Sequence, residues 1–274
     1  GPATFLLDHA ASDMASRLSA VLRSFDLAVD LGTPTNAVRR AIADRVGAIA
    51  AVGRTLPDVA TGLPAIVADE EALPFRDESI DLLTSALSLQ FVNDLPGTLL
   101  QIRRALKPDG LFLAVMIGGE SLTELRTAFA EAEAEMEGGV SPRVAPFVDL
   151  RDIGALLQRA GFALPVTDID RLTVRYASPL ALMHDLRRMG TGNFLTERRR
   201  APLRRATLRR VLEIYAERFA DPDGRIRATF DLIWLSGWAP HESQQKPLAP
   251  GSARMRLADA LRTQEISTGE KAGR

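Results

Sequence analysis

Short apolar runs separated by amphipathic stretches occupy the first half of the chain. Five of these runs have the length of a strand and cover residues 27–32, 47–52, 64–69, 80–89 and 110–119. They are apolar almost throughout instead of at every second position, which is typical of strands buried on both faces of a parallel sheet. The pattern therefore predicts an α/β fold with helices on both faces of the sheet.

Helical periodicity marks three stretches around these runs. Apolar residues recur at every third or fourth position over 5–25, which predicts an amphipathic helix ahead of the sheet. Residues 35–46 and 94–107 have the pattern of helices between strands, and the Lys-Pro-Asp-Gly turn at 107–110 is expected to end the second one. Such helices are the connections that parallel strands require.

The second half of the chain has a different order of elements. A helix at 149–161 leads into an alternating stretch at 163–177, predicted as one bent strand or a pair of strands. Helices at 178–190 and 200–220 follow, and a strand at 228–240 is expected to close the sheet.

These elements predict one domain without a linker between independent parts. The domain is expected to cover 5–246, with a helical insertion from about 178 to 225, before the last strand. Residues 247–274 are richer in proline, glycine and charge, so we expect a polar and poorly ordered tail.

The composition excludes several kinds of site. The chain has no cysteine, which rules out disulfides, thiolate nucleophiles and cysteine-containing zinc sites. Its three histidines, His9, His184 and His241, are too far apart in sequence for a metal-binding motif, and no metal site is predicted. The net charge of −1 argues against a general nucleic-acid-binding protein.

Hydropathy and the excess of arginine over lysine bear on where the protein acts. No run approaches the roughly 18 apolar residues of a membrane-spanning helix, and no basic start with an apolar core indicates a signal peptide. Arginine far outnumbers lysine, as in proteins from GC-rich bacterial genomes. We therefore expect a bacterial protein in the cytoplasm.

Two segments are strongly charged. Residues 197–210 carry seven arginines and one glutamate, whereas residues 120–137 carry six glutamates and one arginine. Each is interpreted as the solvated face of a helix. The alternative for the arginine segment is a docking surface for an acidic partner, a lipid headgroup or nucleic acid, which leaves peripheral membrane association open.

The first predicted strand runs into a turn of unusual composition. Asp30 and Gly32 are followed by Thr33, Pro34 and Thr35, where a dinucleotide site needs further glycines so that backbone amides can approach the pyrophosphate. A dinucleotide is therefore not expected. The two threonine hydroxyls can cap the next helix or contribute to a ligand site.

An adenosylmethionine site makes smaller demands, because this ligand has no phosphate groups. It needs an acid and a glycine turn after strand one, an acid after strand two for the ribose, and an acid after strand three near the adenine. Asp30 with Gly32, and Asp69 with Glu70, meet the first and last demands. The second strand ends in alanines and valine at 50–52, and the missing acid could weaken binding by about 2 kcal/mol. In the alternative interpretation these acids cap turns or lie exposed in loops.

Several motifs resemble those of known methyltransferases. Residues 67–126 resemble a class I S-adenosylmethionine-dependent methyltransferase from its third to its fifth strand, on the motifs LPFRDESIDLL and LKPDG. The motifs ADEEALPF, GGESLTELR, HDLRRMGTGN and WAPHESQQKP resemble more specifically the mitochondrial complex I assembly factors described as arginine hydroxylases, and their alphaproteobacterial relatives. This likeness covers about residues 5 to 262. A more distant likeness is to the malonyl-carrier-protein O-methyltransferases of biotin synthesis.

The resemblance implies a Rossmann-like sheet of seven strands with a reversed last strand. It places Ser88 and Gln90, at the end of strand four, among the residues that contact cofactor or substrate. Gln90 and His241 are candidate catalytic residues, the latter because imidazole titrates near neutrality. Arg143 is a candidate for binding a carboxylate or carrier phosphate. In the alternative interpretation, these four residues are ordinary polar residues at a strand edge or in a surface loop.

The resemblance also implies a function, with alternatives. The first is modification, by hydroxylation, of an arginine in a quinone-module subunit of complex I, with adenosylmethionine as the cofactor and a protein as the partner. The second is an assembly chaperone that has lost its cofactor. The third is an O-methyltransferase acting on a carrier-protein thioester or a small molecule. Whether the chain is a transferase, a hydroxylase or no enzyme stays open at this point.

Overall fold

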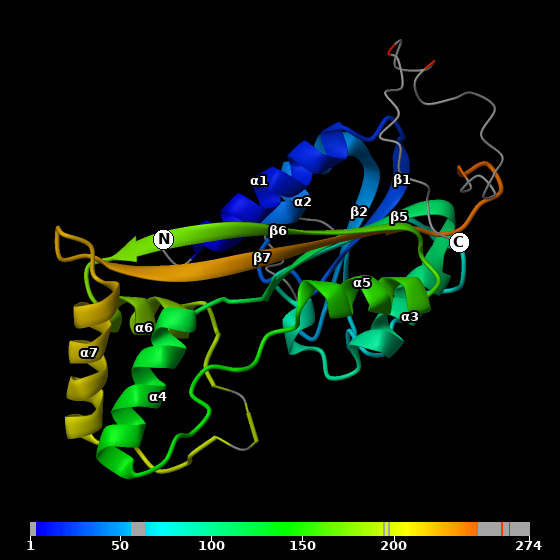
Figure 1. Cartoon of the computed structure of the whole chain (residues 1–274). Coiled ribbons are helices and arrows are strands. Elements are labelled where there is room, and N and C mark those ends of the chain that lie inside the picture. The colour runs from blue at the N-terminus through cyan, green and yellow to red at the C-terminus, as the bar shows by residue number, and fades with distance from the viewer. Residues whose placement is uncertain are drawn as a thin grey trace, which may run out of the picture. The chain divides into compact units, whose positions relative to one another are not determined.

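The computed structural model of the chain describes residues 4–55, 64–193, 195–196, 198–245, 259 and 263. Residues up to Pro240 belong to one compact unit built on a sheet of seven strands, in the order β3-β2-β1-β4-β5-β7-β6 (Figure 1). The strands are β1 (Phe25–Leu31), β2 (Val46–Gly53), β3 (Ala65–Val67), β4 (Ile80–Ala86), β5 (Leu106–Gly118), β6 (Ala163–Tyr176) and β7 (Ile226–Trp238).

Strand direction and order place the functional end of this sheet. The pairs among β1, β2, β3, β4 and β5 are parallel, and β7 is antiparallel to both β5 and β6. The reversed last strand is therefore confirmed. Chain order reverses between β1 and β4, which are neighbours in the sheet, and open α/β sheets bind ligands beyond the carboxyl ends of the strands at such a point.

The helices cover both faces of the sheet, as predicted. In Figure 1, α1 and α2 lie on one face and α3 and α5 on the other, while α4, α6 and α7 lie together below the left-hand ends of β6 and β7. The helices are α1 (Phe5–Ser19), α2 (Ala37–Ala41), α3 (Leu95–Ala105), α4 (Thr123–Glu137), α5 (Leu150–Arg159), α6 (Pro179–Arg188) and α7 (Arg205–Phe219), with two short 3-10 turns, η2 (Ala43–Arg45) and η4 (Leu89–Phe91).

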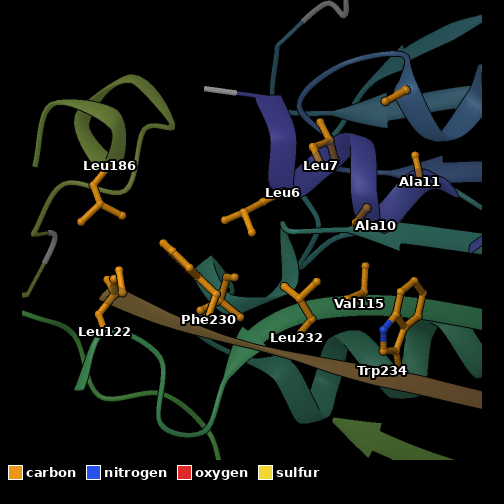
Figure 2. Packing of buried hydrophobic residues seen from close by; sticks show 14 of the residues in the cluster. Leu6, Leu7, Ala10, Ala11, Val115, Leu122, Leu186, Phe230, Leu232 and Trp234 are labelled. Atoms are coloured by element: carbon orange, nitrogen blue, oxygen red, sulfur yellow. The ribbon is translucent and has the colours of Figure 1, made fainter. Parts of the chain in front are cut away.

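The central strands are apolar throughout because their successive side chains point alternately into two hydrophobic cores, one on each face of the sheet. Successive side chains of β5 enter opposite cores: Val115 packs under α1, whereas Ala114 and Met116 pack under α3 and α5. Figure 2 shows the apolar side of α1 facing Val115, Leu232 and Trp234. Both faces of β4, and of β5 from Gly110 on, are buried, so their sequences show no alternating polar positions.

The last two strands extend past the rest of the sheet. Residues 226–230 of β7 pair with β6 alone, because the β5 partner ends at Gly118, opposite Asp231. The predicted stretch 163–177 is one strand, with a register shift between Ala163 and Val166. The helices α6 and α7 lie between β6 and β7 in the chain, which matches the predicted helical insertion.

Two predicted helices are shorter in the structure. The N-terminal helix was expected to reach residue 25 but ends at Ser19. After this point the Arg45 guanidinium holds the chain by donating hydrogen bonds to the carbonyls of Leu18 and Val21, at 3.2 and 2.8 Å. The helix expected at 35–46 keeps only Ala37–Ala41 as α-helix. Its periodicity runs on, but the chain must enter β2 at Val46 to pair with β1.

The Lys-Pro-Asp-Gly segment is not a turn between a helix and a strand. Ile80 of β4 pairs with Leu106, and Leu82 pairs with Leu111, so the segment forms an irregularity inside β5. Asp109 adopts a left-handed backbone there, with φ of 61°. The strand therefore begins directly at the end of α3.

The described residues from His241 onward belong to a second unit. The tail predicted for 247–274 lies outside the described residues, apart from 259 and 263. The extent of the domain therefore stays a prediction. In the part of the chain that the structure describes, no helix has the length and apolar character needed to cross a membrane.

Candidate functional site

Two adjoining cavities open beyond the carboxyl ends of the parallel strands. The first, which we call the turn cavity, has a volume of about 280 Å³ and is lined by residues 32–34 and 51–55 together with Arg39, Glu70 and Ser88. The second, the apolar cavity, has about 420 Å³ and is lined mainly by aliphatic and aromatic side chains. The residues that line both are Pro34, Leu87, Phe91 and Val92.

Gly32 shapes the turn after β1. Its φ is +69°, and a Cβ at this position would lie 2.0 Å from Ser88 Oγ and 3.1 Å from Glu70 Oε1. Its amide donates to the carbonyl of Val52 at 2.6 Å, which ties the turn to β2. The position therefore requires glycine for backbone conformation and for contact with Ser88 and Glu70.

Asp30 is completely buried and turned toward internal donors. Its carboxylate accepts hydrogen bonds from Arg39 Nη1 at 2.7 Å, Thr33 Oγ1 at 2.5 Å and Thr84 Oγ1 at 3.3 Å. Burial raises the pKa of Asp30 to about 6, against the opposing effects of the Thr33 hydrogen bond and the Arg39 charge. Asp30 lines neither cavity, and its predicted contact with a cofactor stays a prediction.

The two threonines of the turn serve the protein's own backbone. The Thr33 hydroxyl donates to Asp30 and accepts from the amide of Ala86 at 3.1 Å. Thr35 Oγ1 accepts from the amide of Ala37, the first residue of α2, at 3.2 Å. Thr35 therefore helps to cap α2 as expected, whereas the Thr33 hydroxyl is occupied by buried groups.

An arginine stands where the second strand enters the turn cavity. Arg54 follows β2 directly, and its Nε donates to Glu70 Oε2 at 2.9 Å. The Glu70 side chain is 10% exposed and the Arg54 side chain 55%. Asp69 lies farther from Arg54, at 3.9 Å, and is half exposed, with its Oδ1 accepting from the amide of Glu71.

These contacts test whether adenosylmethionine fits the residues present. The ribose of such a cofactor would need a carboxylate after β2, and among the described residues Arg54 occupies that place. Asp30 pairs with Arg39 and Glu70 with Arg54, whereas Asp69 is half exposed. Arg54 and Thr55, the described residues that directly follow β2, include no carboxylate.

The predicted strand-four residues lie at the two cavities. Ser88 is buried against Gly32 in the turn cavity. Gln90 lines the apolar cavity, donates to the carbonyl of Leu87 at 2.8 Å, and keeps its Oε1 buried without a hydrogen-bond partner among the described residues. Leu87, which lines both cavities, has a left-handed φ of 54°, a strained conformation for a branched residue.

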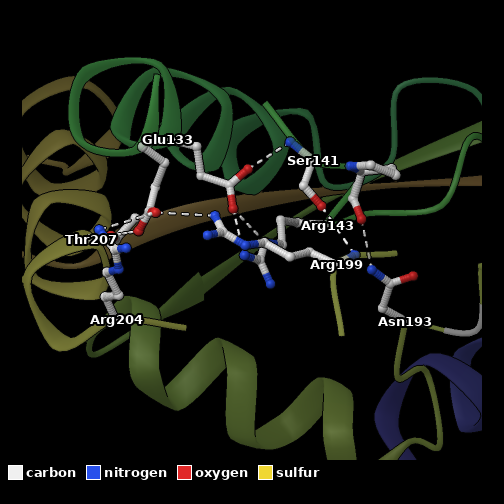
Figure 3. A network of polar contacts seen from close by, with 9 residues as sticks. Glu133, Ser141, Arg143, Asn193, Arg199, Arg204 and Thr207 are labelled. Atoms are coloured by element: carbon white, nitrogen blue, oxygen red, sulfur yellow. Dashed lines mark hydrogen bonds and ion pairs between the residues drawn. The ribbon is translucent and has the colours of Figure 1, made fainter. Parts of the chain in front are cut away.

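Arg143 lines the apolar cavity but its guanidinium already has an acidic partner. Glu133 of α4 is completely buried and accepts from Arg143 Nε and the amide of Ser141, both at 2.7 Å. The loop is held from the other side by Asn193, which donates to the carbonyl of Pro142 at 2.7 Å (Figure 3). The predicted role of Arg143 in substrate binding stays a prediction, and its visible role is to fix the loop that walls the cavity.

The two charged segments found in the sequence meet each other. Arg199 donates to Glu137 at 3.1 Å, and Arg210 of α7 donates to Glu135 of α4 at 2.6 Å. Figure 3 shows Arg199, Arg204 and Thr207 converging on the end of α4. A large part of the arginine segment therefore has an acidic partner within the chain.

Some groups at or near the site gave no signal in the sequence. Arg39 and Arg54 were not singled out, because each was one member of a common class of charged residue and its partner lies on another element. Glu133 belongs to the segment 120–137 that was interpreted as a solvated helix face, and this interpretation is wrong at Glu133, whose side chain is completely buried. His241 belongs to the second unit, where its Nδ1 lies 2.6 Å from Ser243 Oγ. Among the described residues, no group of three histidine, cysteine or acidic side chains is placed to hold a metal ion.

Comparison with known proteins confirms the fold. A family model described as a methyltransferase domain matches residues 29–114, which include the turn after β1. The solved structure of the YcgJ protein from Bacillus subtilis has a TM-score of 0.58 at 17% identity, covering 85% of this chain and 99% of that one. The predicted class I methyltransferase fold is therefore correct, and it is a fold that binds S-adenosylmethionine in methyltransferases.

Both sequence resemblances are confirmed as well. The malonyl-[acyl-carrier protein] O-methyltransferase of Halorhodospira halophila is 35% identical over 190 residues, which cover 69% of this chain and 62% of that protein. The mitochondrial arginine-hydroxylase NDUFAF5 of Danio rerio is 38% identical over 277 residues, which cover 97% of this chain and 85% of that protein.

These relatives correct the predicted location. The matching arginine-hydroxylases of zebrafish, mouse, human and Dictyostelium are all mitochondrial, which contradicts the expectation of a cytoplasmic bacterial protein. The likeness covers 97% of this chain for the zebrafish and mouse proteins and 93% for the human protein. The chain belongs to the family of the NDUFAF5 arginine-hydroxylases.

Proposed function

We propose that this protein hydroxylates an arginine side chain of a protein partner, and that the partner is a subunit of respiratory complex I. The observation that carries the proposal is the 38% identity to an arginine-hydroxylase over 97% of the chain. The cavity pair supports it, because a polar and an apolar compartment adjoin each other beyond the carboxyl ends of the parallel strands.

The apolar cavity suits the aliphatic part of an arginine. Its walls include Phe91, Val92, Met116 and Ile117, which would surround methylene groups and exclude water from the carbon that reacts. The Glu133–Arg143 contact keeps the wall loop in place. The role of these residues is to position the acceptor C–H bond.

The chemistry requires reagents beyond the side chains of the site. Hydroxylation replaces a C–H bond with a C–OH group, and with dioxygen as the oxidant the second oxygen atom leaves as water. That reduction consumes two electrons and two protons, which an external two-electron reductant must supply. No step is assigned to adenosylmethionine, since the described residues that directly follow β2 include no carboxylate.

The experiment that tests this proposal uses mass spectrometry of complex I subunits. Subunits from cells with the gene, without it, and with the gene restored are digested and compared. We expect one arginine to gain a single oxygen atom only where the protein is present. A subunit arginine that carries the oxygen equally in the deleted cells would contradict the proposal.

A second candidate function is favoured by the engaged acids of the turn cavity. A cofactor-independent assembly chaperone would need neither Asp30 nor Glu70 free, and both are paired with arginines. In that case deletion would impair complex I assembly while the arginine carries no added oxygen in any cells.

The third reading, an O-methyltransferase on a carrier-protein thioester, has its own test. Arg143 and Arg188 are the charged residues among the described lining of the apolar cavity, and a free carboxylate on the acceptor could approach them. If this reading holds, growth of the deletion strain is restored by added biotin and complex I is unaffected.

A further inference from the structure

We propose that Glu70 is the carboxylate that binds the guanidinium of the substrate arginine, and that Arg54 occupies this place until the substrate displaces it. The inference rests on the proposed function, because it assumes an arginine as the acceptor. It assigns to the turn cavity a role in recognising the substrate.

A guanidinium that leaves water needs a carboxylate, preferably one that can accept two hydrogen bonds. The described residues that line the apolar cavity include two arginines and no aspartate or glutamate. In the turn cavity, the described lining includes one carboxylate, that of Glu70. Within the described part of the two cavities, Glu70 is therefore the acid available to an arginine substrate.

Other buried acids near the site are not available. Asp30 is completely buried behind Arg39, and it lines neither cavity. Glu133 is also completely buried, with Arg143 and the Ser141 amide as partners. A substrate would have to dismantle a buried ion pair to reach either of them, which is strongly unfavourable.

The contact between Glu70 and Arg54 is different, because one partner is held loosely. Arg54 Nε lies 2.9 Å from Glu70 Oε2, yet the Arg54 side chain is 55% exposed and can move into water at little cost. Arg54 presents to Glu70 the same chemical group that a substrate arginine would present. The structure thus records a guanidinium bound to Glu70 within the turn cavity.

The arrangement of the cavities gives a substrate side chain a route to Glu70. Pro34, Leu87, Phe91 and Val92 line both cavities, so an arginine entering the apolar cavity would pass its methylenes along these apolar walls. Long basic side chains bury their stems in this way while their charged ends reach a polar partner. The carbon to be hydroxylated would then lie among apolar groups and the guanidinium at Glu70.

The test measures binding of N-acetyl-arginine methylamide to the full chain by titration calorimetry, beside the citrulline analogue, which has the same shape without the charge. We expect the wild-type protein to prefer the arginine probe at least tenfold. Arg54→Ala should bind that probe about tenfold more tightly than the wild type, since no internal guanidinium competes. Glu70→Gln should lose the preference while it binds the citrulline analogue as before.

Arg104→Ala is the matched control, because Arg104 is 57% exposed and forms a surface ion pair with Asp77 at 3.1 Å. It should bind both probes as the wild type does. Unchanged thermal unfolding of Glu70→Gln, together with its citrulline binding, shows that the variant is folded.

The proposal is overturned if Glu70→Gln keeps the preference for arginine, or if neither the wild type nor Arg54→Ala binds the arginine probe. It is also overturned if Glu70 proves necessary for S-adenosylhomocysteine alone. Complex I subunits from Glu70→Gln cells separate the two claims. Normal hydroxylation in the Glu70→Gln cells would overturn this inference and leave the proposed function standing. Charge-specific binding of the arginine probe by the wild type, without hydroxylation of any subunit, would overturn the proposed function and leave the role of Glu70 in binding standing.

Discussion

At the scale of single residues, the turn after β1 has two kinds of constraint. Asp30 and Arg39 form a buried pair with their side chains 0% and 3% exposed. Breaking such a pair leaves an uncompensated charge in the interior, which typically costs about 3 to 5 kcal/mol. Asp30 is therefore required by the fold, whatever ligand the neighbouring cavity binds.

The pKa of Asp30 gives a pH-dependent prediction. Burial raises its pKa from 3.8 to about 6, so between these values the folded protein binds more protons than the unfolded chain. Stability contributed by protonated Asp30 is complete below about pH 4 and is lost as the pH rises through about 6. The unfolding free energy of the wild type, relative to Asp30→Asn, should be about 1 kcal/mol higher at pH 5 than at pH 7.

Urea denaturation of both proteins at the two pH values measures this difference, because the other titrating groups are common to them. An equal difference at pH 5 and pH 7 would mean that Asp30 keeps its charge throughout this range.

Gly32 gives a second prediction at the same scale. Gly32→Ala should destabilise the protein by roughly 1 to 3 kcal/mol, because it adds a side chain at φ of +69° and 2.0 Å from Ser88 Oγ. Adding Ser88→Gly should recover the part of the loss due to the clash. Gly53→Ala is the control, since its Cβ would have no neighbour nearer than 3.9 Å. Urea midpoints measure all three, and a Gly32→Ala protein as stable as Gly53→Ala would refute the argument.

At the scale of elements, α4 and the loop after it control one wall of the apolar cavity. Glu133 projects from α4 and holds the loop through Ser141 and Arg143. The same helix uses Glu135 and Glu137 to hold residues around α7. One acidic helix therefore connects the wall loop with the helices inserted between β6 and β7.

This arrangement predicts a local effect of Glu133→Gln. Replacing the buried carboxylate with an amide leaves the Arg143 guanidinium without its charged partner. We therefore expect a loss of about 2 to 4 kcal/mol in unfolding free energy. Amide hydrogen exchange in residues 139–148 should become faster, because the loop loses its anchor. Glu131→Gln is the control, since Glu131 lies on the same helix and pairs with Arg218 away from this loop. Equal exchange in both variants would show that Glu133 does not anchor the loop.

How far the sequence predicted these elements depended on the range of the interactions. The strands were predicted within a few residues, because burial on both faces leaves a local apolar signal. The helix at 35–46 was predicted too long, since its periodicity continues into residues that pairing with β1 draws into β2. The contact between Arg210 and Glu135 joins residues 75 positions apart, and no local pattern marks it.

At the scale of the whole molecule, the fold was more predictable than the chemistry of the site. Gly32, Thr33, Glu70 and Ser88 line one cavity, because the parallel strands end at the same edge of the sheet, and their role in binding a cofactor stays a prediction. The engagement of Glu70 by Arg54 was not predicted, because it depends on which charged side chains meet across that edge. A fold carries its cavity with it, whereas the ligand is decided by a few side chains.

The absence of a carboxylate among the described residues that directly follow β2 leads to a final prediction. Arg54→Asp would place a carboxylate directly after β2 and release Glu70 from its internal partner. Two hydrogen bonds to ribose hydroxyls contribute about 2 kcal/mol, so binding of S-adenosylhomocysteine should strengthen roughly 30-fold over the wild type. Because a ligand that binds only the native state raises the melting temperature, the variant should show a ligand-dependent increase in Tm that exceeds that of the wild type.

Arg54→Ala separates the two effects of the substitution, since it removes the guanidinium without supplying an acceptor. If the ligand stabilises Arg54→Ala and Arg54→Asp equally, the arginine excludes the ligand and no acid is needed to bind the ribose. Strong binding by the wild type would instead show that the cofactor is held through other groups of the turn cavity.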